Sequence, residues 1–134
     1  MPKLDAVAIT TTNMAKTVAF YEILGFEFPD WSAEDRHVEP VTKPGEVRLM
    51  IDTAELMEQL TGARPVPPNH SSFALVCESV EEVNALAEAL RSAGHRITTE
   101  PWDAFWGQRY ATVKDPDGYT MDLFAALAGD PTTS

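Results

Sequence analysis

The sequence NMAKTVAFYEILGF, residues 13–26, contains the signals of a helix with defined ends. Asn13 is a favoured helix N-cap, and Gly25 is favoured just beyond a helix end because glycine adopts the left-handed backbone without steric cost. Between them, apolar side chains recur at helical spacing: Met14, Val18 and Tyr21. The apolar runs on either side, residues 4–10 and 26–28, are predicted to be strands. The stretch therefore predicts a strand–helix–strand unit.

The same plan recurs in the second half of the chain. The run SFALVC, residues 72–77, is a predicted strand, and Ser79 and Glu82 form a capping box for the helix that follows. The apolar stripe of that helix consists of Val83, Leu86 and Leu90. Gly94 ends the helix, and the segment 95–100 resumes a strand. The chain is therefore predicted to contain an internal repeat.

Each half then continues with further predicted strands. In the first half they are residues 35–41 and 46–52. In the second half they are residues 108–114 and 119–124, which flank the turn sequence Asp-Pro-Asp-Gly at residues 115–118. Each half thus has the order β-α-β-β-β, and the predicted fold is α+β with two tandem modules.

The length of 134 residues fits one domain. We expect a single domain over residues 1–127, with the first module at about 3–53 and the second at about 71–127. The linker between them, at about 54–70, includes a short helix over residues 54–60. Residues 128–134 are predicted to be a frayed tail.

The composition excludes several classes of function. Ten basic and 21 acidic residues give a net charge of −11, which disfavours binding to nucleic acid or to anionic membranes. This charge suits a cationic small molecule, although it equally serves solubility. No apolar run is long enough to span a membrane, and residues 1–12 do not resemble a signal peptide, so a cytoplasmic protein is expected. The single cysteine, Cys77, is interpreted as a buried, inert thiol.

Three stretches in this order resemble the vicinal oxygen chelate superfamily. They are FYEILGF at residues 20–26, WGQRYATVKDPDG at 106–118 and DPDGYTMDLF at 115–124. The superfamily includes glyoxalase I, extradiol dioxygenases, fosfomycin-modifying enzymes and bleomycin-resistance proteins. The resemblance covers residues 4–125. It implies two modules that form a curved mixed sheet around a cup, and a homodimer with ligand sites near the interface.

The resemblance also allows a test for a metal site. Superfamily enzymes hold a divalent metal through four cup-facing side chains, typically His and Glu. The matching positions here are Ala6, Met50, Ser72 and Asp122, of which only Asp122 is a competent ligand. His70 lies two residues before the Ser72 position, next to two prolines. We therefore expect neither a metal nor another cofactor.

The placement of the aromatic residues is the main remaining signal. Trp31 follows the first module's second predicted strand, and Trp102, Phe105 and Trp106 crowd the loop before the penultimate strand. Indole rings stack on planar or cationic ligands, although these residues could instead pack an interface or fill the cup. The Trp106-Gly107 pair, followed by an arginine-containing strand, resembles the bleomycin-resistance-like branch, in which aromatic side chains clamp a drug without metal.

The candidate ligand-binding residues combine these aromatic residues with the side chains that alternation places in the cup. The set is Trp31, Arg48, Met50, Trp102, Phe105, Trp106, Arg109, Tyr110 and Asp122. Asp122 could pair with a cationic ligand, with Arg48 or with Arg109. No catalytic residue is assigned.

The leading hypothesis is a metal-independent protein that binds and sequesters an aromatic small molecule, such as an antibiotic. One alternative is a lyase, isomerase or dioxygenase-like enzyme of the superfamily with a non-standard or absent metal site, in which Asp122 could act as a general base. A further alternative is a small-ligand sensor or assembly partner without chemistry.

Overall fold

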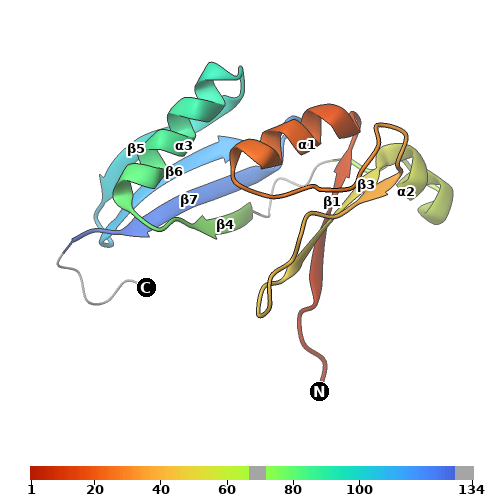
Figure 1. The fold of residues 1–134 in the computed structure, drawn as a ribbon, viewed down its shortest axis with the longest axis horizontal. Helices are drawn as coiled ribbons and strands as arrows, with labels where there is room; N and C mark the ends of the chain where they lie inside the picture. The colour runs from red at the N-terminus through yellow and green to blue at the C-terminus, as the bar shows by residue number, and fades with distance from the viewer. Residues whose placement is uncertain (67–71, 129–134) are drawn as a thin grey trace. The chain divides into compact units, whose positions relative to one another are not determined.

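The computed structural model describes residues 1–66 and 72–128, and the chain forms two compact units, Met1–Pro67 and Pro68–Ser134. Figure 1 shows the elements of both units. Unit 1 contains β1 (Ala6–Thr11), α1 (Met14–Ile23), β2 (His37–Val38), β3 (Arg48–Thr53) and α2 (Ala54–Thr61). Unit 2 contains β4 (Ser72–Val76), α3 (Val80–Ser92), β5 (Arg96–Ala104), β6 (Gln108–Lys114) and β7 (Thr120–Ala126). Two modules, each with a mixed sheet, confirm the predicted α+β fold.

The sheet of unit 1 has the strand order β1-β3-β2, with β1 parallel and β2 antiparallel to β3. Alternate strand residues are buried on one face, namely Ile9, Thr11, Val38, Leu49 and Ile51. On that face the Thr11 and Thr17 hydroxyls form a buried hydrogen bond of 2.8 Å, which ties β1 to α1. The opposite face carries Arg48, Met50 and Asp52, and we call it the open face of unit 1.

The sheet of unit 2 has the strand order β4-β7-β6-β5, in which only the β4–β7 pair is parallel. Helix α3 packs on one face of β5, β6 and β7, as Figure 1 shows. The core between them consists of fully buried side chains: Val83, Leu90, Ala111, Val113, Met121 and Leu123. The strand residues of opposite parity form the open face of unit 2.

The predicted helix signals act as expected. The Asn13 side chain accepts a hydrogen bond from the Lys16 amide at 3.0 Å, and the Ser79 hydroxyl accepts one from the Glu82 amide at 3.1 Å. Gly25 lies just beyond α1 with φ +100°, a left-handed conformation that favours glycine. The caps and glycines therefore bound the helices where the sequence places them.

Two predicted strands of unit 1 differ from the structure. Residues 26–28 form no strand within the described part of unit 1, and the predicted strand 35–41 shortens to the two residues of β2. The backbone of the first segment makes one bond to the second, from the Val41 amide to the Glu27 carbonyl at 2.9 Å. Pro29 and Pro40 explain the difference, because proline has no amide hydrogen to donate to a strand ladder.

One correction concerns Trp102, which lies on β5 and not in a loop. Strand β5 is an edge strand, and its register with β6 shifts between Thr99 and Trp102. Such an irregular edge tolerates Pro101, so the strand continues to Ala104, beyond the predicted end at residue 100.

Cys77 follows β4, and its residue surface is 8% exposed. Burial raises the pKa of its thiol to about 11, which keeps the reactive thiolate scarce at neutral pH. The expectation of a buried, unreactive thiol agrees with this position.

No helix in residues 1–66 or 72–128 is long and apolar enough to cross a membrane. The predicted linker is helical over α2, and residues 62–66 form neither helix nor strand. The rest of that linker, including His70, and residues 129–134 of the predicted tail lie outside the described residues.

Candidate functional site

A row of apolar side chains, one from each of the four strands, crosses the open face of unit 2. Trp102 pairs with Tyr110, Tyr110 with Phe124, and Phe124 with Val76. Directly paired residues share a face, so the four side chains lie side by side. Val76 is 65% exposed and Trp102 is 39% exposed. The row is therefore accessible apolar surface.

The hairpin between β5 and β6 adds two further aromatic rings to one end of this row. Trp106 is central: its ring centroid lies 5.7 Å from that of Trp102, 4.9 Å from Phe105 and 5.2 Å from Tyr110. All three contacts are edge-to-face, the geometry that aromatic pairs favour. We call these four residues the aromatic cluster. Phe105 is 90% exposed and Trp106 is 42% exposed, so the cluster is not part of the core.

The Trp106 indole is held in place by a hydrogen bond. Its Nε1–H donates to Gln108 Oε1 at 2.9 Å, and Gln108 lies at the start of β6. The backbone bond from the Gly107 amide to the Ala104 carbonyl, at 3.0 Å, closes the turn that carries Phe105 and Trp106. Gly107 has φ +91°, which this turn requires. The cluster is thus fixed by the hairpin and needs little ordering on binding a ligand.

A polar contact adjoins the cluster. The Tyr110 hydroxyl hydrogen-bonds to the Asp122 carboxylate, and burial, reinforced by this bond, raises the pKa of Tyr110. Asp122 is half-buried, and its cross-strand neighbours are Ala74 and Thr112. The open face of unit 2 therefore combines aromatic rings with one carboxylate.

Arg109 does not join this site. It pairs with Asp103 on β5, and its alternation with Tyr110 places it on the face covered by α3. Its guanidinium donates to Asn84 Oδ1 at 3.0 Å and to Asp103 Oδ1 at 3.1 Å. The arginine that was predicted to bind ligand thus connects α3 to β5 through these two hydrogen bonds.

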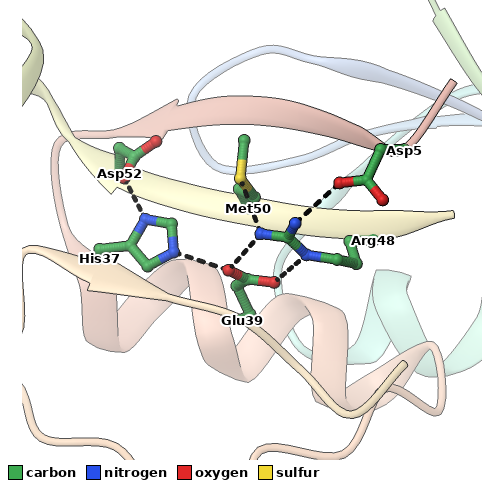
Figure 2. A network of polar contacts seen from close by, with 6 residues as sticks. All are labelled: Asp5, His37, Glu39, Arg48, Met50 and Asp52. Carbon is green, nitrogen blue, oxygen red and sulfur yellow. Dashed lines mark hydrogen bonds and ion pairs between the residues drawn. The ribbon is translucent and has the colours of Figure 1, made fainter. Parts of the chain in front are cut away.

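The open face of unit 1 carries a network of charged side chains, shown in Figure 2. Glu39 is its hub: its carboxylate accepts two bonds of 2.9 Å from Arg48 and contacts His37 Nε2 at 2.8 Å. His37 Nδ1 lies 2.5 Å from Asp52, and Arg48 also donates to Asp5 at 2.8 Å. We call these five residues the charged network. It links β1, β2 and β3 across the sheet.

These contacts fix the charge states of the network. Hydrogen bonds to Glu39 and Asp52 raise the pKa of His37, which favours an imidazolium with a donor for each carboxylate. The bidentate contact with Arg48 lowers the pKa of Glu39 to about 2. Every charged group of the network therefore has an internal partner of opposite sign.

The predicted site residues belong to both units. The structure brings together Trp102, Phe105, Trp106, Tyr110 and Asp122 on unit 2. Arg48 and Met50 lie on the open face of unit 1, where the Met50 thioether accepts a bond of 3.4 Å from Arg48. Trp31 is half-buried in the connection between α1 and β2 of unit 1 and is not part of the aromatic cluster.

Sequence reasoning missed the charged network. His37-Val38-Glu39 places a histidine and a glutamate two positions apart, which puts both side chains on one side of an extended backbone. That spacing was a usable signal. The contribution of Asp52 depends on its pairing with His37 across β2 and β3, which the local sequence does not specify.

The donor set does not fit the superfamily's divalent metal. Of the four matching positions, Ala6 on β1 has no ligand atom and pairs with Arg48. The Ser72 hydroxyl, at the start of β4, is a weak neutral ligand, and Asp122 on β7 is the one competent ligand of the set. In the described ranges 1–66 and 72–128, no group of three or more His, Cys, Asp or Glu side chains is placed to hold a metal ion.

Solved structures share this fold. A glyoxalase-related enzyme from Fulvimarina pelagi superposes with a TM-score of 0.80 at 18% identity, covering 93% of this chain and 88% of its own. A hypothetical protein from S. aureus gives a TM-score of 0.78 at 21% identity, covering 94% and 95%. A glyoxalase/bleomycin resistance protein/dioxygenase from Nocardioides gives 0.70 at 22%, covering 100% and 89%.

No curated protein sequence matches the chain. The family model of the glyoxalase/bleomycin resistance protein/dioxygenase superfamily, however, matches residues 3–123, nearly the whole chain. Together with two tandem modules of the expected fold, this match shows that the chain belongs to the glyoxalase/bleomycin resistance protein/dioxygenase superfamily.

Proposed function

We propose that this protein binds a flat aromatic small molecule on the open face of unit 2 and sequesters it without chemical change. The observation that carries the proposal is the aromatic cluster, whose rings contact one another and yet remain exposed. A contiguous exposed apolar patch on a water-soluble fold commonly marks a binding surface. An antibiotic or another aromatic natural product is the ligand class that we favour.

The energetics are adequate for such a role. Stacking of one aromatic ring on an aromatic side chain is worth about 1–3 kcal/mol. Two such contacts, with burial of the remaining ligand surface, can supply the roughly −8 kcal/mol of micromolar affinity. Because Gln108 already fixes the Trp106 indole, little of this energy is lost in ordering the site.

The resemblance to the bleomycin-resistance-like branch supports the same proposal. It rests on Trp106-Gly107 followed by the strand that contains Arg109. In that branch aromatic side chains clamp a drug without a metal. The metal-ligand positions of this chain suit such a role, because Ala6, Met50 and Ser72 stand where the superfamily's enzymes have histidine or glutamate.

The test is a binding screen with aromatic antibiotics and DNA-damaging natural products. We expect saturable quenching of tryptophan fluorescence by at least one compound, with no change in its mass after incubation. By calorimetry, Trp106→Ala should raise the Kd of that compound at least tenfold. A matched control is Leu60→Ala, which removes an exposed apolar side chain from α2 of unit 1. If Trp106→Ala binds the compound like the wild type, the aromatic-clamp proposal is wrong.

One observation favours an alternative, a superfamily enzyme with a non-standard or absent metal site. His37 is a half-exposed histidine fixed at Nδ1 by the buried Asp52, an arrangement that orients an imidazole for proton transfer. Glu39 occupies Nε2, however, so a substrate would have to displace a carboxylate that Arg48 holds. A product that forms with wild type and Trp106→Ala protein but not with His37→Gln would establish this alternative.

A further inference from the structure

Asp122 differs from Glu39 and Asp52 of the charged network because no arginine, lysine or histidine of the described residues forms an ion pair with it. Glu39 contacts Arg48 and His37, and Asp52 contacts His37. Asp122, by contrast, contacts the Tyr110 hydroxyl, a neutral group. Within residues 1–66 and 72–128, none of the ion pairs made by arginine or histidine includes Asp122.

The neighbours of Asp122 on its own face are neutral too. Across the strands these are Ala74 and Thr112, and along β7 they are Thr120 and Phe124. The nearest cation by register is Lys114, one row away. Its ammonium is bonded to the Gly118 carbonyl and the Thr120 hydroxyl, each at 3.3 Å. Among the described residues, therefore, no cation is in ion-pair contact with Asp122.

We propose that Asp122 selects a cationic group on the aromatic ligand, so that this face binds a protonated or alkylated amine attached to an aromatic ring system. This inference rests on the proposed function, because the ring system is bound by the aromatic cluster. It adds the charge of the ligand and the residue that recognises it.

The geometry of the face suits such a molecule. Asp122 lies one row from the apolar row, and residues two apart on a strand are separated by about 7 Å. Tyr110 connects the two rows because it contacts both Trp106 and Asp122. A cation within about 6 Å of the centre of an indole or phenol ring is attracted by the ring face as well. The aromatic rings and the carboxylate thus both favour a positive charge on the ligand. The net charge of −11 also attracts a cation at long range.

Three probes with one ring system and different charges test this inference. They are (naphthalen-2-ylmethyl)trimethylammonium, 2-naphthalenemethanol and 2-naphthaleneacetate, each titrated into the full chain by calorimetry or ligand-observed NMR. We expect the ammonium probe to bind at least fivefold more tightly than the alcohol. Asp122→Asn keeps an oxygen acceptor for the Tyr110 hydroxyl and removes the charge, and it should abolish this preference. Glu81→Gln removes the same charge from the exposed surface of α3 and should leave the preference intact.

The outcomes separate this inference from the proposed function. If the preference survives Asp122→Asn, or falls equally in Glu81→Gln, the attraction is a property of the whole protein and the role of Asp122 is overturned. If all three probes bind alike and Trp106→Ala weakens each of them, the aromatic site stands without charge selection. If no probe binds, and the antibiotic panel also fails, the proposed function itself is wrong.

Discussion

The open faces of the two units rest on the same plan, a helix on one side of a mixed sheet, yet they differ in what their side chains contact. On unit 1, Arg48, His37 and three carboxylates contact one another. On unit 2, the aromatic rings contact one another but keep much of their area exposed. The side chains on the open face of unit 1 bind one another across the strands, whereas those on the open face of unit 2 remain available to a ligand. A repeated module can therefore divide stability and recognition between its copies.

The sharpest test of this division compares one predicted ligand-binding residue on each unit. Trp102→Ala should weaken binding of the aromatic ligand about tenfold, or about 1.4 kcal/mol, because it removes one ring of the aromatic cluster. Met50→Ala, on the charged face, should change the Kd less than twofold. Calorimetric titration measures both. A larger loss in Met50→Ala would mean that unit 1 forms the ligand site.

The converse test removes the hub of the charged network. Glu39→Ala should lower the free energy of unfolding by about 1 kcal/mol, because Arg48 and His37 lose their shared acceptor while partial exposure limits the cost. Urea denaturation measures this. The control, Asp103→Ala, removes an exposed partner of Arg109 on unit 2 and should cost less. Equal losses would contradict a special role for the network.

The pH dependence of stability should come from unit 1 as well. The pKa of folded His37 is raised by Glu39 and Asp52, so the folded state binds its proton more tightly than the unfolded state. The stabilisation is complete below the unfolded pKa, near 6.5, and is lost as pH rises through the higher folded pKa. The difference in unfolding free energy between wild type and His37→Gln should therefore shrink between pH 5.5 and pH 8.5. A difference that stays constant or grows would refute this assignment.

The smallest effect is expected at the tip of the hairpin on unit 2. Phe105 is 90% exposed, so Phe105→Ser should change the free energy of unfolding by less than about 0.5 kcal/mol. Thermal and urea unfolding would measure it. A large destabilisation would show that the aromatic cluster supports the fold, and the contrast between the two faces would fail.

The sequence predicted the features that depend on near neighbours. Asn13 and Ser79 begin helices because each cap acts within three residues, and the hairpin aromatics stay together because they are close in sequence. The strand predictions were less accurate near prolines. Strand pairing is shorter than predicted near Pro29 and Pro40, whereas β5 continues through Pro101 on the edge of its sheet.

The charged network could not be predicted as a whole. Asp5 and Arg48 are 43 positions apart and meet only through the β1–β3 register. Arg109 was predicted to bind ligand together with Tyr110, but neighbouring residues on a strand point to opposite faces of the sheet, so the two side chains lie on different sides. Long-range register, and not residue type, decides which side chains share a face.

The buried thiol of Cys77 can serve as a built-in probe of local opening in unit 2. The chain has one cysteine, and the thiol can react with an aromatic disulfide reagent only when the structure around β4 opens. When reclosing is faster than the reaction, the rate of labelling under native conditions therefore reports the population of molecules in which this part of unit 2 is open. A ligand that binds only the closed state lowers the labelling rate in proportion to the fraction of protein that stays unbound. The affinity for a colourless, non-fluorescent compound could thus be measured from the slower labelling of Cys77.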